Sequence, residues 1–166
     1  VIMTPRIQSL VDCIKSEKPD VRSAAYVDTG PVMDKAWAVR SGVGWLGKHT
    51  NVITKKYGSW VFLGEIIVDV ELEYDEPIAD FCGSCTACIE ACPTDAIVEP
   101  YVLDSTKCIS YITIEHRGDI REELKPKLAN WVYGCDICQE VCPWNRFQQP
   151  TEELAFRPRD QNVDPD

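Results

Sequence analysis

Eight of the nine cysteines of this chain lie after Phe81, and most of them are two or three residues apart. The first group, CGSCTACIEACP, has the spacing C-x2-C-x2-C-x3-C-P from Cys82 to Cys92. Bacterial two-cluster ferredoxins use this run, and its fourth cysteine ligates the other [4Fe–4S] cluster. We therefore expect Cys82, Cys85 and Cys88 to bind one cluster and Cys92 to bind a second.

The second group, YGCDICQEVCPWN at residues 133–145, has only three cysteines. By pseudo-symmetry with the first group, Cys142 crosses back and completes the first cluster. The second cluster then lacks one ligand, and Cys108 in TKCISY is the remaining candidate, displaced upstream by the inserted residues 109–134. The predicted ligand sets are Cys82, Cys85, Cys88 and Cys142 for the first cluster and Cys92, Cys108, Cys135 and Cys138 for the second.

Zinc is the alternative metal, because structural zinc sites also use four cysteines. Zinc sites usually show paired C-x2-C knuckles, whereas the run from Cys82 to Cys92 is more specific for [4Fe–4S] clusters. Cysteines this close together rarely form disulfides with one another, which favours a reducing compartment. Cys13 stands apart among apolar residues, and we expect it to be a small buried hydrophobic residue on a helix.

The composition is that of an ordinary globular protein, with 45% hydrophobic and 27% charged residues among 166. The formal net charge of −10 argues against indiscriminate nucleic-acid binding but allows a local basic patch. No run of about 18 apolar residues and no secretory leader is recognisable, so we expect a cytoplasmic protein without a membrane segment. Because Val1 is not a methionine, we expect the chain to be part of a longer protein.

The acidic, proline-bearing stretch ELEYDEPIAD at residues 71–80 is expected to be a linker or a long surface loop. Before it, apolar spacing predicts a helix at residues 4–18, a strand at 22–27 and a helix at 32–40. These elements would form the sheet-and-helix core of the first part of the chain.

Two further β-rich runs, at residues 51–54 and 59–70, are joined by KKYG and are expected to pair as a hairpin. The predicted fold class is α+β. It comprises a partial α/β-type segment at residues 1–80, a two-cluster ferredoxin-like domain at 81–148 and a tail or the start of a next domain at 149–166.

Five blocks of sequence extend the pattern beyond the cysteines: YVDTGPVMDKAWAVRSGVGWLGKHTNVI, GSWVFLGEI, CGSCTACIEACPTDAIV, CISYITIEHRG and YGCDICQEVCPWN. In order and spacing, from about Arg22 to Asn145, they resemble the epoxyqueuosine reductase family. The resemblance implies a bacterial oxidoreductase of queuosine biosynthesis, which reduces the epoxide of epoxyqueuosine to queuosine at the wobble position of certain tRNA anticodons. It also implies cobalamin and two [4Fe–4S] clusters, with residues 1–80 as part of the cobalamin and substrate site. Electrons would pass through the clusters to a cobalt that attacks or reduces the epoxide carbon.

The resemblance assigns the family's proton donor, the aspartate of the VDTGP block, to Asp28. An opening epoxide builds charge on oxygen, and a protonated carboxyl group nearby can act as a general acid. A carboxyl group against a large apolar corrin has its pKa raised by desolvation, so it can hold a proton near neutrality. The residue pattern alone favours a turn-shaping role, because Asp before Thr-Gly-Pro is common in turns. With the resemblance, we expect Asp28 to be catalytic and to contact the cobalamin.

The glycine-rich loop GWLGKHTNVI lets backbone approach a ligand closely, and Lys48, His49 and Thr50 in it can meet the amide side arms of cobalamin. Ser110 and Asp136 adjoin cysteines of the second cluster, where that cluster should meet the corrin. For each residue, a solvated loop position is the alternative. The predicted cofactor contacts are Asp28, Lys48, His49, Thr50, Ser110 and Asp136.

In the full-length protein, the expected partners are the anticodon stem-loop of tRNA and an electron donor such as a flavodoxin or ferredoxin, and we expect a monomer. Family members carry a segment before the equivalent of Val1 that contributes to the cobalamin site, and usually helical repeats after the equivalent of Asp166 that help to hold the tRNA. The segment IEHRGDIREELKPK offers basic residues for phosphate, although a solvated helix face explains them at least as well. The residues considered for tRNA are His116, Arg117, Arg121, Lys125, Lys127, Lys55, Lys56 and Arg146.

Two other functions stay open from the sequence. Reductive dehalogenase-type enzymes also pair cobalamin with two clusters. They usually carry an export signal and a tyrosine donor, however, and the VDTGP block fits them poorly. A plain ferredoxin-type domain, which passes electrons to a partner, needs only the clusters.

Overall fold

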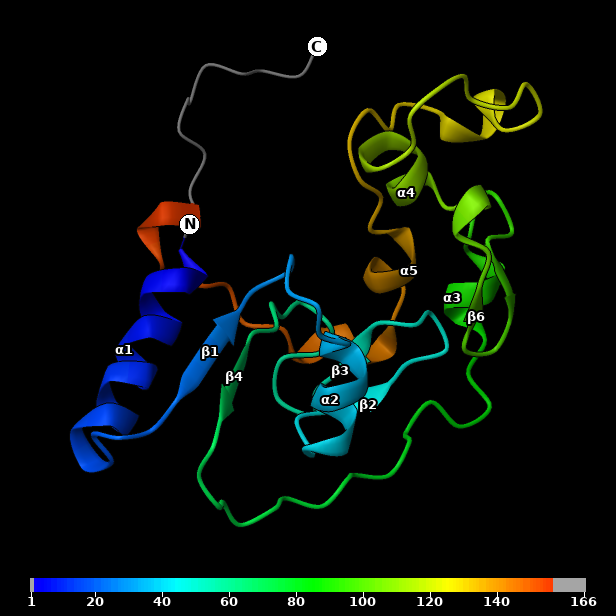
Figure 1. Cartoon of the computed structure of the whole chain (residues 1–166). Coiled ribbons are helices and arrows are strands. Elements are labelled where there is room, and N and C mark those ends of the chain that lie inside the picture. The colour runs from blue at the N-terminus through cyan, green and yellow to red at the C-terminus, as the bar shows by residue number, and fades with distance from the viewer. Residues whose placement is uncertain (1, 157–166) are drawn as a thin grey trace. The chain divides into compact units, whose positions relative to one another are not determined.

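The computed structural model describes residues 2–156. Within these residues the chain forms two compact units that alternate along the sequence. One unit comprises residues 2–30, 64–70 and 149–156, and the other comprises residues 31–63 and 71–148. Both units combine helical and two-stranded sheet structure, so the mixed α and β character expected from the sequence is confirmed (Figure 1). The functional division at residues 80 and 148 stays a prediction.

The first unit packs one helix on a two-stranded sheet. It contains α1 (Met3–Glu17), β1 (Ser23–Tyr26), β4 (Glu65–Val68) and the 3₁₀ turn η4 (Leu154–Phe156). β1 and β4 are antiparallel, with Ser23 opposite Val68 and Tyr26 opposite Glu65. The helix and the first strand predicted for this part of the chain are confirmed.

Helix α1 buries one narrow apolar stripe. Ile7 and Val11 are buried and lie one helical turn apart. Cys13 is exposed, so the prediction that it is a buried hydrophobic residue is wrong. Cys13 lies two residues after Val11, which turns it about 200° away from the buried stripe.

The second unit begins with α2 (Asp34–Arg40), which confirms the predicted helix in this region. Two small antiparallel sheets follow: β2 (Trp45–Leu46) pairs with β3 (Val52–Ile53), and β5 (Ile97–Glu99) pairs with β6 (Val102–Leu103). The helices of the cysteine-rich part are α3 (Ala87–Glu90), α4 (Ile109–Ile114) and α5 (Ile137–Glu140). The 3₁₀ turns are η1 (Ser105–Lys107), η2 (Lys125–Leu128) and η3 (Pro143–Phe147).

The expected hairpin between residues 51–54 and 59–70 is wrong. β3 pairs with β2, whereas the later run supplies β4 to the sheet with β1. Between the two runs, the described residues form an isolated bridge from Thr54 to Gly58. Alternation and turn residues locate strands but do not choose partners, because every strand offers the same backbone groups. Here Trp45 and Ile53, both almost fully buried, face each other across β2 and β3.

Residues 71–80 form no regular structure and are almost all exposed, as a linker or long surface loop should be. This confirms the expectation for ELEYDEPIAD. In the part of the chain that the structure describes, no helix combines the length and the apolar character that a membrane crossing requires.

Asn145 ties the end of the second unit to its middle. This side chain is buried, and its Oδ1 accepts the backbone N–H of Ser59 at 2.7 Å. Its amide nitrogen donates to the carbonyl of Gln139 at 2.6 Å and to the hydroxyl of Ser59 at 3.0 Å. Gly58 has a φ of +65°, and a Cβ there would lie 2.0 Å from Asn145 Oδ1. The contact therefore fixes the backbone that follows Cys142.

We expect Asn145→Ala to lower the free energy of unfolding by about 2 kcal/mol, because it leaves the buried N–H of Ser59 without an acceptor. Urea unfolding of the metal-free chain, followed by far-UV circular dichroism, measures this loss. Asn130→Ala is the matched control, since Asn130 is exposed. Equal losses in the two variants would contradict the role of Asn145.

Candidate metal centre

A cavity of about 180 Å³ in the second unit brings four thiols together. The apolar part of the cavity wall is formed by Phe81, Trp144 and Ile53. Trp45 packs edge-on against two of these rings, with centroid distances of 5.2 Å to Phe81 and 4.8 Å to Trp144. The cysteines that line this cavity are Cys82, Cys85, Cys88 and Cys142.

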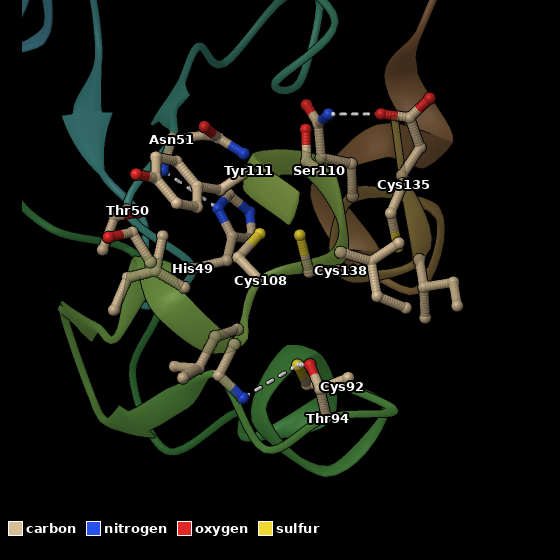
Figure 2. Close-up of a pocket in the computed structure, with 18 of the residues that line it drawn as sticks. His49, Thr50, Asn51, Cys92, Thr94, Cys108, Ser110, Tyr111, Cys135 and Cys138 are labelled. Atoms are coloured by element: carbon tan, nitrogen blue, oxygen red, sulfur yellow. Dashed lines mark hydrogen bonds between the residues drawn. The ribbon is translucent and has the colours of Figure 1, made fainter. Parts of the chain in front are cut away.

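A larger cavity, of about 410 Å³, holds the other set of thiols. Figure 2 shows the sulfur atoms of Cys108 and Cys138 directed into the same space, beside the imidazole ring of His49. The cysteines that line this cavity are Cys92, Cys108, Cys135 and Cys138. The two cavities thus divide the eight cysteines into the same groups as the predicted ligand sets. That each group binds a cluster stays a proposal.

The division follows from a helix that occurs twice. Cys88 is the second residue of α3 and Cys138 is the second residue of α5, and each helix is four residues long. Cys92 and Cys142 each lie two residues after the end of a helix. Each helix therefore sends the thiol inside it to one cavity and the thiol after it to the other.

Burial governs the acidity of most of these thiols. It raises the pKa of Cys82, Cys88, Cys135 and Cys142, and raises that of Cys138 to about 12. For Cys92, backbone N–H groups outweigh burial and lower the pKa, and one of them donates from Ala96 to the sulfur at 3.2 Å. Because metal centres bind thiolates, loading the site must release the protons that burial retains.

Lys48 and Asp80 hold the loop that carries Cys82 and Cys85. The buried ammonium group of Lys48 donates to the carbonyl of Gly83 at 2.7 Å and to that of Cys85 at 2.9 Å. Asp80 accepts the N–H of Cys82 at 2.7 Å and the phenol of Tyr101. The N–H of Tyr101 in turn donates to the carbonyl of Lys48 at 3.1 Å. Lys48 thus lies against the smaller cavity, and its predicted contact with cobalamin stays a prediction.

His49 lines both cavities and is 3% exposed. Its Nδ1 accepts the backbone N–H of Asn51 at 3.2 Å. Desolvation lowers the pKa of His49 to about 4, so the ring is neutral at neutral pH.

Three more of the predicted cofactor contacts line the larger cavity with His49. Thr50 and Ser110 are half-buried, whereas Asp136 is exposed at the start of α5 and accepts the side-chain amide of Gln139 at 3.2 Å. The structure therefore brings these polar groups beside the second set of cysteines. Their contact with cobalamin stays a prediction.

Asp28 belongs to the first compact unit. It is exposed and has a φ of +67°. The N–H of Thr29 donates to the carbonyl of Val27 at 2.8 Å, which makes Asp28 the central residue of a three-residue turn. Such turns with positive φ are rare and strained. Asp28 shapes this turn, and its catalytic role stays a prediction.

The basic residues considered for tRNA are mostly engaged within the chain. Arg117 donates to the carbonyl of Ile114 at 3.0 Å, Lys125 pairs with Glu122 and Lys127 pairs with Asp95 at 3.1 Å. Residues 115–124 form no helix, so the alternative of a solvated helix face is wrong for that part of the segment.

The residues of the larger cavity that the sequence did not single out include Lys35, Asn51 and Tyr111. The ammonium group of Lys35 donates to Asn51 Oδ1 at 3.0 Å, and desolvation lowers its pKa. Tyr111 directly follows Ser110, and Asn51 directly follows Thr50. For Tyr111 and Asn51, their position next to a predicted cofactor contact could have identified them from the sequence. Lys35 offered no such signal, because it comes from a separate helix, α2.

The family model described as "4Fe-4S double cluster binding domain" matches residues 81–145. Within residues 2–156, no group of three or more His, Cys, Asp or Glu side chains is arranged to hold a single metal ion. The match favours iron–sulfur clusters over the zinc alternative. The fold and the cysteines therefore define a protein with a ferredoxin-like [4Fe–4S] double-cluster domain.

Relatives extend the similarity beyond this domain. The epoxyqueuosine reductase of Cellulophaga algicola is 52% identical over 157 residues, which cover 95% of this chain and 51% of the relative. A crystal structure of epoxyqueuosine reductase with an epoxyqueuosine-modified tRNA-Tyr stem loop matches with a TM-score of 0.86 at 42% identity, covering 90% of this chain and 40% of that one. The Bacillus subtilis enzyme, with its catalytic aspartate loop swung out of the active site, matches with a TM-score of 0.82 at 41% identity, covering 87% of this chain and 38% of that one.

By these comparisons, this chain is similar to the epoxyqueuosine reductase family over most of its length. It spans about half the length of the curated relatives that it matches.

The crossed ligand sets make a prediction about single cysteine variants. We expect Cys142→Ser to impair the same cluster as Cys85→Ser, because both thiols line the smaller cavity, and Cys135→Ser to impair the other. Each variant should retain about four iron atoms per chain instead of about eight. Iron and sulfide analysis with Mössbauer and EPR spectra of reconstituted protein measures this.

Cys13→Ser is the control, and it should leave both clusters intact because Cys13 is exposed on α1. Should Cys142→Ser change the same spectral component as Cys135→Ser, the crossed assignment is wrong.

Proposed function

We propose that the protein represented by this chain reduces the epoxide of epoxyqueuosine to queuosine in tRNA. The observation that carries the proposal is the pair of adjoining cavities, each lined by four cysteines. Close spacing of two clusters suits electron transfer, and the similarity to epoxyqueuosine reductases over 95% of the chain supplies the substrate.

In this proposal the eight thiolates bind two [4Fe–4S] clusters. Three features of the chain suit that role. The thiols lie on short loops, the aromatic rings around Trp45 shield the smaller cavity, and Ala96 donates an N–H to a ligand sulfur. Hydrogen bonds and solvent access at the sulfurs are the means by which a protein sets cluster potentials.

The larger cavity supports a cobalamin site next to the second cluster. Its volume of about 410 Å³ is more than twice the 180 Å³ of the smaller one, although each has four cysteines. His49, Thr50, Ser110 and Asp136 give it a polar wall, which suits a cofactor that carries amide side arms. When bound, cobalamin supplies the low-valent cobalt that reduces the epoxide carbon. The side chains named here would orient it by hydrogen bonding.

Asp28 is the proposed general acid, which protonates the epoxide oxygen as the ring opens. Its place in the VDTGP block supports this role. The structure of the Bacillus subtilis relative has a catalytic aspartate loop that swings out of the active site. The exposed, strained turn around Asp28 is consistent with a loop that changes position.

The proposal also includes the setting of the reaction. The tRNA would bind through its anticodon stem-loop, as the complex of a relative with a stem loop suggests. A flavodoxin or ferredoxin would supply the electrons to a monomeric enzyme in the cytoplasm.

We expect Asp28→Asn to lower the rate of epoxide reduction by about 10²- to 10⁴-fold, because the amide cannot donate the proton. The assay follows queuosine formation in epoxyqueuosine-containing tRNA with the reconstituted holoenzyme. Asp20→Asn, an exposed aspartate of the same unit, is the control and should retain full rate. Full activity of Asp28→Asn with both cofactors bound would rule out the catalytic role.

We expect Ser110→Ala and Thr50→Ala each to weaken cobalamin binding by about 2- to 10-fold, the effect of one lost hydrogen bond. Equilibrium titration, followed by the cobalamin absorption spectrum, measures the affinity. Ser9→Ala, an exposed position on α1, provides a matched control. A wild-type chain that binds both clusters but no cobalamin would instead favour the ferredoxin-type alternative. A chain that binds cobalamin but does not act on the tRNA would favour the dehalogenase-type alternative.

A further inference from the structure

His49 occupies an unusual place between the two groups of cysteines. It comes from the loop between β2 and β3, and among the residues that line the two cavities it alone is shared by both. It is 3% exposed, so water reaches it very little. A polar ring at such a position needs partners from the protein or from a bound group.

A backbone hydrogen bond determines which ring nitrogen of His49 carries the hydrogen. The N–H of Asn51 donates to Nδ1 at 3.2 Å, so Nδ1 is an acceptor and carries no hydrogen. The neutral ring must then carry its hydrogen on Nε2. This atom is buried and has no hydrogen-bond partner among the described residues.

A second donor of the same kind lies close by in sequence. The indole Nε1 of Trp45 is also buried, and its ring packs against Phe81 and Trp144 at the smaller cavity. Burial raises the pKa of Cys82, a thiol of that cavity, and a hydrogen bond from Trp45 partly offsets the rise. The Trp45 donor thus meets a sulfur at the smaller cavity, whereas the Nε2 donor of His49 lies buried beside the thiols without a protein acceptor among the described residues, which indicates that its acceptor belongs to a bound group. The sulfide and thiolate sulfurs of an iron–sulfur cluster are acceptors of the right kind.

Figure 2 shows how the imidazole ring of His49 lies. One ring nitrogen faces the backbone of Asn51, and the ring lies beside Cys108, whose sulfur shares its space with that of Cys138. We propose that His49 is a positioning residue that donates its Nε2 hydrogen to a sulfur of the cluster held by Cys92, Cys108, Cys135 and Cys138. The inference rests on the proposed function, because it needs that cluster.

Such a bond has a defined consequence for electron transfer. Reduction adds negative charge to the cluster, and an N–H directed at a sulfur stabilises that charge. The donor therefore raises the reduction potential of the cluster next to the larger cavity. Because His49 has one Nε2 hydrogen to donate to one cluster, the reduction potential of the other cluster should not change.

The first experiment uses the complete chain, reconstituted with iron and sulfide under anaerobic conditions and labelled with ¹⁵N-histidine. The sequence contains two histidines, His49 and His116, so the label reports on only two sites. Pulsed EPR of the reduced clusters should detect a ¹⁵N coupling that persists in His116→Gln and disappears in His49→Gln. Absence of the coupling in the wild type, with about eight iron atoms per chain, would overturn the proposal.

The second experiment measures the midpoint potential of each cluster by EPR-monitored titration. His49→Leu should shift the potential of the Cys108 cluster to a more negative value, and His49→Gln, which keeps an N–H donor, should restore part of the shift. His116→Gln should match the wild type. An unchanged potential in His49→Leu with full iron content would overturn the proposal. Should His49→Leu fail to assemble its clusters, the ¹⁵N coupling in the wild type decides.

The two proposals can fail separately. If the wild-type chain takes up no clusters, both the proposed function and the role of His49 fall. If it takes up both clusters and shows no coupling to His49, the role of His49 alone is overturned.

Discussion

The short helix that separates two thiols is the constraint on which the rest of the site depends. A thiol within α3 and a thiol two residues past its end project in different directions, so Cys88 and Cys92 cannot serve one cavity. The same holds for Cys138 and Cys142 around α5. Each cavity can be completed only by a cysteine from the other half, which brings the two halves together. The inserted segment between them is tolerated because it leaves both helices intact.

Loops this short bury little apolar surface, so polar contacts hold them in place. Lys48 fixes the loop of Cys82 and Cys85 through two backbone carbonyls, and Asn145 fixes the chain after Cys142 through Ser59 and Gln139. Inside a protein, a fully paired polar group is favourable, whereas one left unpaired is costly. The cysteine loops are therefore held in place by residues from distant parts of the second unit, which pair their backbone groups.

The hairpin of β2 and β3 performs several of these tasks. Trp45 packs against two aromatic rings of the smaller cavity, Lys48 holds the cysteine loop of that cavity, and His49 and Thr50 line the larger cavity. Pairing of β2 with β3 makes this possible, because it bends the chain so that successive side chains reach different cavities. The glycines of GWLG allow the close approach to β3, since a Cβ at Gly44 would lie 2.3 Å from the carbonyl oxygen of Ile53 and one at Gly47 would lie 2.6 Å from Ile53 Cδ1.

The sequence by itself determined the type of metal site and the grouping of the eight cysteines, because cysteine spacing controls which thiols a short loop can bring together. It also determined α1, β1, α2 and the exposed linker, whose signals are local periodicity and turn residues. Only the tertiary structure decided that β4 pairs with β1, that Cys13 faces outward, and that Asn145 and Lys48 hold the cysteine loops. Those features depend on contacts between residues far apart in the chain, such as Ser59 and Asn145, and no local pattern specifies which distant backbone group a buried side chain will meet.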